Sequence, residues 1–168
     1  MFGMIIAVHG KTLTNMENVK AIVKQVVKIW RLYKMQQLVL TVAMRQDIPF
    51  GLRKLLSRDY MICSVLKKEL ANLYDALKCC MRDDCITRPE ASPMMIMNMD
   101  GNTGMAMQKI VSMHRQIITE YETLLTLVNG SSINPLIIHQ HRKQVTGLTE
   151  DLVAHSDDLH DTAVFAAN

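Results

Sequence analysis

The stretch GLRKLLSRDYMICSVLKKELANLYDAL, residues 51–77, repeats a mostly apolar residue at alternating intervals of four and three positions. Side chains with this spacing lie on one face of an α-helix, so the stretch predicts a long amphipathic helix over about 50–80. Pro49 just before it suits a helix start. The repeat is formed by Leu52, Leu56, Asp59, Cys63, Leu66, Leu70, Leu73 and Leu77, and Asp59 is its one charged member.

Three further segments have the same periodicity and predict helices over about 14–45, 103–128 and 135–163. The first begins at Thr14-Asn15-Met16-Glu17, an [ST]xxE capping box. The third segment of the chain closes on Asn129-Gly130, and the fourth opens on Asn134-Pro135, with asparagine as N-cap. The segment interiors contain almost no helix breakers, so four long helices are expected.

The connections between these helices predict how they pair. The turns near 46–49 and 129–134 are short, whereas 81–102 is long, which predicts two antiparallel hairpins joined by a long crossover. Each apolar stripe can be buried only against another helix, so a single all-α four-helix bundle is expected over residues 1–168. We expect Leu66, Leu70, Leu73, Leu148 and Leu152 to lie in one core.

Composition narrows the class of protein. Lys and Arg total 19 against 16 Asp and Glu, and the net charge of +3 forms no basic stripe, so no nucleic-acid partner is expected. The N-terminal MFGMIIAVHGKT does not read as a signal peptide, and no apolar run reaches the ~18 residues of a membrane span. A cytoplasmic chain is expected, although a secreted chain without its signal would look the same.

Phosphate loops, nucleophile elbows and catalytic residue sets are absent from the sequence, which argues against an enzyme.

Two sulfur-rich stretches allow a soft metal. PMMIMNMDGNTGMAMQ, residues 93–108, contains MxM and MxxM spacings that can bind Cu(I), but methionine also fills irregular gaps where a connection lies on a core. Cys79, Cys80 and Cys85 at a helix end favour reduced surface thiols over a metal site, because no histidine is near in sequence. Cys63 is expected to pack as a small hydrophobic residue.

The second half of the chain resembles a known superfamily. HRQIITEYETLL, residues 114–125, and NPLIIHQHRKQV, residues 134–145, are similar to the third and fourth helices of small bacterial ferritin-like bundles of unknown function. The resemblance covers about the last 65 residues, and the first hairpin only by its pattern. It implies a ferritin-like arrangement of two hairpins, and it raises iron binding or a ferroxidase-type activity as an alternative function.

That resemblance implies inward carboxylate ligands, but this chain contains no Glu-x-x-His, the ligand pair of that superfamily. The nearest substitutes are Glu69, Glu120, Asp151, His155 and His114. The carboxylates lie beside the apolar stripes of their helices, which is where solvated helix residues lie. We therefore expect no cofactor, a degenerate or absent metal site, and a function by protein association, with self-association as a homodimer.

Four polar residues nevertheless lie within the apolar stripes themselves, namely Asp59, His114, His141 and His155. We expect the histidines to be hydrogen-bonded core or boundary groups more than metal ligands. An antiparallel turn at 130–133 places His141 level with Tyr121. A buried Asp59 needs a polar or cationic partner.

Overall fold

The computed structural model describes the backbone of residues 4–78 and 103–165, and the side chains of residues 17–78 and 103–155. Within these ranges the protein is all α-helical, as the sequence predicts. Cys79, Cys80, Cys85, the connection 81–102 and the methionines between 93 and 102 lie outside the described residues.

The four helices are α1 (Met4–Arg45), α2 (Phe50–Lys78), α3 (Thr103–Val128) and α4 (Pro135–Phe165). Three of them match the predicted ranges closely, but α1 begins at Met4 and not near Thr14. No proline separates Met4 from Thr14, so nothing interrupts the helix there, and the capping-box pattern lies inside it. Across the described residues, none of these helices is both long enough and apolar enough to cross a membrane.

The turn between α3 and α4 uses the residues that its sequence indicates. Gly130 has a φ of 79°, the left-handed conformation that ends many helices and that glycine adopts without strain. Asn134 Oδ1 accepts a hydrogen bond from the backbone N–H of Leu136 at 3.0 Å, and thereby caps the N-terminus of α4. These two residues fix the antiparallel pairing of α3 with α4.

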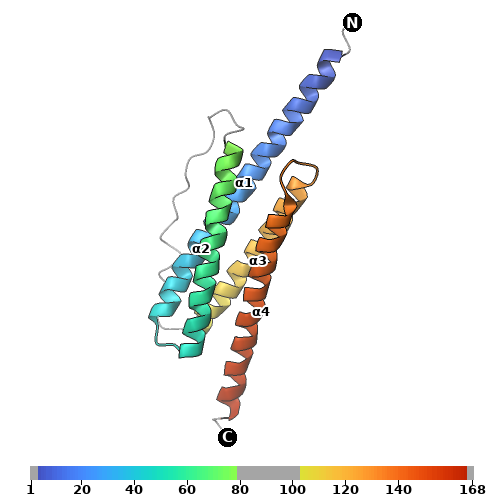
Figure 1. Cartoon of the computed structure of the whole chain (residues 1–168). Coiled ribbons are helices and arrows are strands. Elements are labelled where there is room, and N and C mark those ends of the chain that lie inside the picture. The colour runs from blue at the N-terminus through green and yellow to red at the C-terminus, as the bar shows by residue number, and fades with distance from the viewer. Residues whose placement is uncertain (1–3, 79–102, 166–168) are drawn as a thin grey trace.

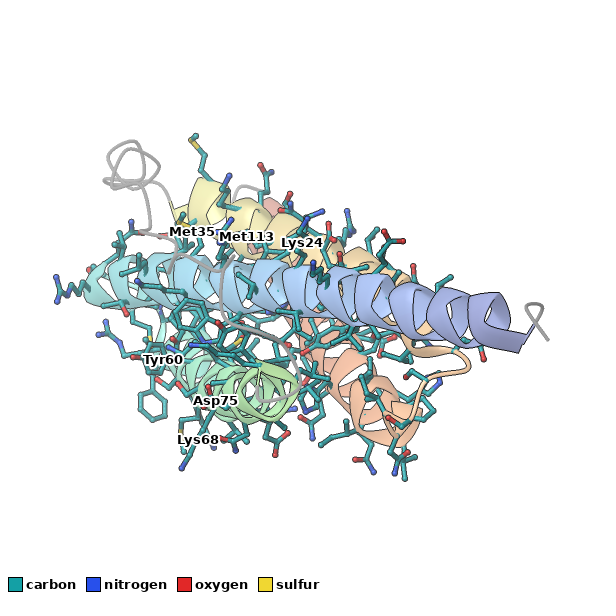
Figure 2. All side chains as sticks on the ribbon, turned by 90° about the horizontal axis from the view of Figure 1, so that it is seen from above. Lys24, Met35, Tyr60, Lys68, Asp75 and Met113 are labelled. Carbon is teal, nitrogen blue, oxygen red and sulfur yellow. The ribbon has the colours of Figure 1, made fainter. Side chains whose placement is uncertain are left out.

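The helices form a four-helix bundle in which α1 packs against both α2 and α3, and α4 packs mainly on α3 (Figure 1). Adjacent helices within each hairpin are antiparallel, while α2 and α3 run in the same direction. Figure 2 shows α1 between α2 and α3, with Lys68 projecting from α2 on the side away from α1. The least extensive contact between neighbours is that of α2 with α4.

The apolar interior is divided into two clusters, so the single core expected from the sequence is wrong. One cluster contains Leu66, Leu70, Tyr121 and Ile138 among its residues, and the other contains Leu52, Leu56, Ile110 and Leu152. Leu73 is only partly buried beside the first cluster, and Leu148 is buried but belongs to neither.

A polar residue stands at the junction of the clusters on each of three helices. On α2, Asp59 lies between Leu56 of one cluster and Cys63 of the other. On α3, His114 lies between Met113 and Ile117, and on α1, Gln36 lies between Tyr33 and Val39, in each case from different clusters. Asp59, His114 and Gln36 are all 0% exposed, and we call this transverse set the polar layer.

Candidate functional site

Two residues of the polar layer, Asp59 and His114, form a cluster of three buried side chains with Cys63. Asp59 and Cys63 are one helical turn apart on α2, where positions i and i+4 share a face. The Cys63 thiol donates to Asp59 Oδ1 at an Sγ–Oδ1 distance of 3.2 Å. His114 reaches the same oxygen from α3, with Nε2 at 3.2 Å. One carboxylate oxygen therefore joins two helices that lie diagonally across the bundle.

The three side chains can present their donor atoms to a common point. One nitrogen, one sulfur and one oxygen atom, one from each residue, lie within 4.8 Å of one another. No other group of three His, Cys, Asp or Glu residues among the described side chains meets this spacing. The three residues are each 0% exposed, so the cluster has no direct contact with solvent.

Several buried polar atoms of the layer have no hydrogen-bond partner among the described residues. They are Asp59 Oδ2, His114 Nδ1 and both amide atoms of Gln36. A buried polar group without a partner costs free energy, and native proteins leave few of them. These atoms lie in one layer and are available to a ligand or to buried water.

Three observations support placing Gln36 in the polar layer. Its neighbour Gln37 hydrogen-bonds through Nε2 to Ser64 Oγ at 2.5 Å, and Ser64 directly follows Cys63. Tyr33, one turn before Gln36, is close enough to Cys63 and Asp59 to interact with both electrostatically. Gln36 is also the residue between the two apolar clusters on α1.

Burial controls the protonation of the cluster. Burial raises the pKa of the Cys63 thiol, and the adjacent Asp59 carboxylate raises that pKa further. Burial, followed by the neighbouring Tyr121, Cys63 and Asp59, likewise raises the pKa of the Tyr33 hydroxyl. The thiol therefore stays protonated and donates to Asp59, so without another cation Cys63 is no nucleophile. The donor set can instead hold a metal ion, which displaces the thiol proton.

The residues predicted as metal ligands do not meet. Only His114 lies in the cluster. Glu120 is buried on α3 and not solvated as expected, because Lys28 Nζ at 2.8 Å and Gln25 Nε2 at 2.7 Å bind its carboxylate. Asp151 is exposed on α4 and pairs with Arg58 at 3.0 Å. His155 is half-buried beside Gly51, and its Nε2 has no partner among the described residues.

Glu69, the remaining predicted ligand, belongs to a second polar network. The hydroxyl of Tyr121 donates to His141 Nδ1 at 3.0 Å, and His141 Nε2–H donates to Glu69 Oε2 at 2.5 Å. His141 is thus level with Tyr121, as the antiparallel register predicts. Burial lowers the pKa of His141, and the nearby Glu69 carboxylate only partly opposes this effect. Glu69 keeps 42% of its side chain exposed, so the network runs from the core to the surface.

Sequence reasoning found Asp59 and His114 as buried polar groups but missed Cys63 and Gln36 as members of the site. The Asp59-x-x-x-Cys63 spacing was the available signal for Cys63, because both residues fall on one seam. Gln36 had no such signal, since glutamine is mostly exposed in proteins.

Comparison of the chain with known protein families, with curated proteins and with solved structures gave no match. The geometry of the site therefore carries the functional argument.

Proposed function

We propose that this chain is a metal-binding helical bundle of ferritin-like architecture, in which one small site replaces a carboxylate-bridged pair of irons. The observation that carries the proposal is the approach of Asp59, Cys63 and His114 donor atoms to within 4.8 Å of one another in a solvent-free layer. The bundle then acts as a binding protein and not as an oxidase.

The distances in the cluster fit a single ion. Metal bonds of about 2.0–2.3 Å to nitrogen, oxygen and sulfur put tetrahedral ligand atoms roughly 3.3–3.8 Å apart. The Cys63–Asp59 and His114–Asp59 distances are both 3.2 Å, close to that spacing, and all three donor atoms lie within 4.8 Å of one another. A carboxylate and a thiolate carry two negative charges, which neutralise a divalent ion and lower the cost of burying it.

The ligand atoms of the cluster do not suit a diiron pair or Cu(I), the two other metal sites that the sequence suggests. A diiron pair needs bridging carboxylates, whereas Glu69, Glu120 and Asp151 each pair with a different protein side chain. A Cu(I) ion prefers sulfur ligands, and the described cluster offers one sulfur beside a hard carboxylate. Since Cys63 must stay a free thiol until metal binds, the proposal suits a reducing compartment such as the cytoplasm.

Metal analysis tests this function. Purified protein should bind one equivalent of Zn²⁺ or Co²⁺ after chelator treatment, and Cys63→Ser should lose most of that affinity. Asp151→Asn is the matched control, because Asp151 is an exposed carboxylate outside the cluster, and it should bind as the native chain does. Stoichiometric aerobic Fe(II) oxidation that disappears in His155→Ala, together with unaltered binding by Cys63→Ser, would support the carboxylate centre instead.

Association with a second copy is the other candidate function, and exposed apolar side chains favour it. Met61 and Val65 are 68% and 55% exposed one turn apart on α2, and Leu136 and Ile137 are 58% and 42% exposed at the start of α4. These residues lie on the two helices that pack least against each other. A specific homodimer would need to bury more than ~1,000 Å² in total.

Sedimentation measures this association directly. The native chain should sediment as a dimer at micromolar concentration, and Met61→Lys with Val65→Lys should yield a folded monomer. Tyr60→Lys, on the same helix and less exposed, is the matched control. A native chain that stays monomeric to high concentration contradicts the homodimer.

A further inference from the structure

The metal site proposed above has three ligands, and zinc in proteins takes four donors when it is structural. A site with three protein ligands keeps an exchangeable water and can be catalytic, whereas a site with four is closed. The source of the fourth donor therefore decides what kind of site the protein contains.

Gln36 is a buried side chain of the polar layer whose amide oxygen can serve as that donor. It is 0% exposed, and neither its amide oxygen nor its amide nitrogen has a hydrogen-bond partner among the described residues. On α1 it marks the same junction of the two apolar clusters that Asp59 marks on α2 and His114 on α3. The hydrogen bond of Gln37 with Ser64 also shows that this turn of α1 lies beside the turn of α2 that contains Cys63.

We propose that Gln36 Oε1 is the fourth ligand of a closed, structural Zn²⁺ site formed with Asp59, Cys63 and His114. This inference rests on the proposed metal-binding function and adds the identity of the ion and the kind of site. The site joins α1, α2 and α3 at one point in the middle of the bundle.

The charge balance of the layer favours glutamine as that donor. Asp59 and the Cys63 thiolate already neutralise a divalent cation, so a neutral donor completes the coordination without adding charge to a buried site. An amide oxygen supplies this donor, whereas a fourth anionic ligand would leave the buried complex negative.

Binding is an exchange of protons without any change in oxidation state. The S–H bond of Cys63 breaks as the sulfur–zinc bond forms, and one proton leaves to solvent for each ion bound. His114 now has Nε2 directed at Asp59, so its proton moves from Nε2 to Nδ1 when Nε2 becomes a ligand. The Asp59 oxygen exchanges its two hydrogen bonds for a bond to zinc.

The decisive variant is Gln36→Leu, measured on the full chain with Zn²⁺ and with Co²⁺ as a spectroscopic probe. Loss of even an outer-shell partner weakens metal binding by about 10- to 100-fold, and loss of a direct ligand should cost at least as much. The cobalt form of the native chain should be tetrahedral and indifferent to added azide or cyanide. The cobalt form of Gln36→Leu should take up either anion, because the fourth position is then open.

Gln37→Leu is the matched control, since Gln37 is the adjacent glutamine and bonds to Ser64 and Lys67 outside the cluster. It should bind zinc like the native chain. Removing two unpartnered buried amide atoms should also leave metal-free Gln36→Leu at least as thermostable as the metal-free native chain, so its loss of affinity is separable from misfolding.

The outcomes separate this inference from the proposed function. A native chain that binds neither Zn²⁺ nor Co²⁺ overturns both. A native chain that binds one ion while Gln36→Leu binds it equally well, and stays indifferent to azide, overturns the Gln36 assignment alone. A native cobalt form that itself takes up azide shows an open site and also rejects the assignment.

Discussion

The contribution of a single side chain to the stability of the bundle depends on the groups that surround it. Leu70 is 1% exposed within the apolar cluster that also contains Leu66 and Tyr121. At the polar layer, by contrast, Asp59 and His114 are equally buried but depend on each other for a hydrogen bond. Apolar positions therefore tolerate conservative exchange, whereas polar ones depend on their partner.

Leu70→Ala should lower the free energy of unfolding by roughly 2–5 kcal/mol, because it removes buried methyl groups and leaves a cavity. Urea denaturation followed by circular dichroism measures this loss. Lys68→Ala is the control, since Lys68 is exposed on the same helix (Figure 2) and should change stability little. A loss below about 0.5 kcal/mol at Leu70 would mean that this face of α2 is not part of the core.

Asp59→Ala should lower the free energy of unfolding of the metal-free protein. It leaves His114 Nε2 and the Cys63 thiol buried without their common acceptor. Loss of one partner from a buried polar pair typically costs about 1–3 kcal/mol, and more for charged groups. In the double variant Asp59→Leu, His114→Leu both partners are gone, so it should be more stable than Asp59→Ala in the same urea assay. If the double variant is the less stable one, the layer is not held by this pair.

The helices follow the predicted pattern well in their interiors and less well at their ends. The seam of α2 is buried from Leu52 to Leu70, because a four–three repeat leaves one solution for which face turns inward. The start of α1 could not be fixed, because the capping-box sequence is a local signal that caps a helix only where the helix begins, and α1 begins ten residues earlier, at Met4. The convergence of Cys63, His114 and Gln36 depends on axial offsets between helices, which periodicity does not encode.

At the level of elements, α4 is tied to α2 through His141 and Glu69. The folded protein holds the pKa of His141 below its ordinary value of about 6.5, so the unfolded chain binds the proton more readily. Stability from this group is therefore present above about pH 6.5 and is lost as pH falls from there toward the folded pKa.

Urea midpoints measured between pH 7.5 and 5 should fall with acidification, and His141→Gln should flatten that dependence. His139→Gln is the control, because His139 is exposed on the same helix. An equal slope in native protein and His141→Gln would show that His141 does not couple folding to pH in this range.

At the scale of the whole molecule, metal binding should raise the free energy of unfolding. A ligand that binds only the folded chain adds about 2.7 kcal/mol at a free concentration of 100 times its dissociation constant. Thermal unfolding midpoints should therefore rise with free Zn²⁺, and a chelator should reverse the rise. Cys63→Ser should show no such dependence, while a midpoint that is unaffected by zinc in the native chain contradicts the site.

The division of the interior into two clusters has a consequence for how the chain selects its alignment. Both clusters draw on all four helices, so neither is complete until the two hairpins have met. A slide of α2 along α3 by one turn would still match leucine to isoleucine, but it would press the Asp59 carboxylate against apolar side chains instead of His114. The polar layer thus specifies the axial alignment of the helices, because any alignment that separates Asp59 from His114 leaves a buried carboxylate without its partner and costs free energy.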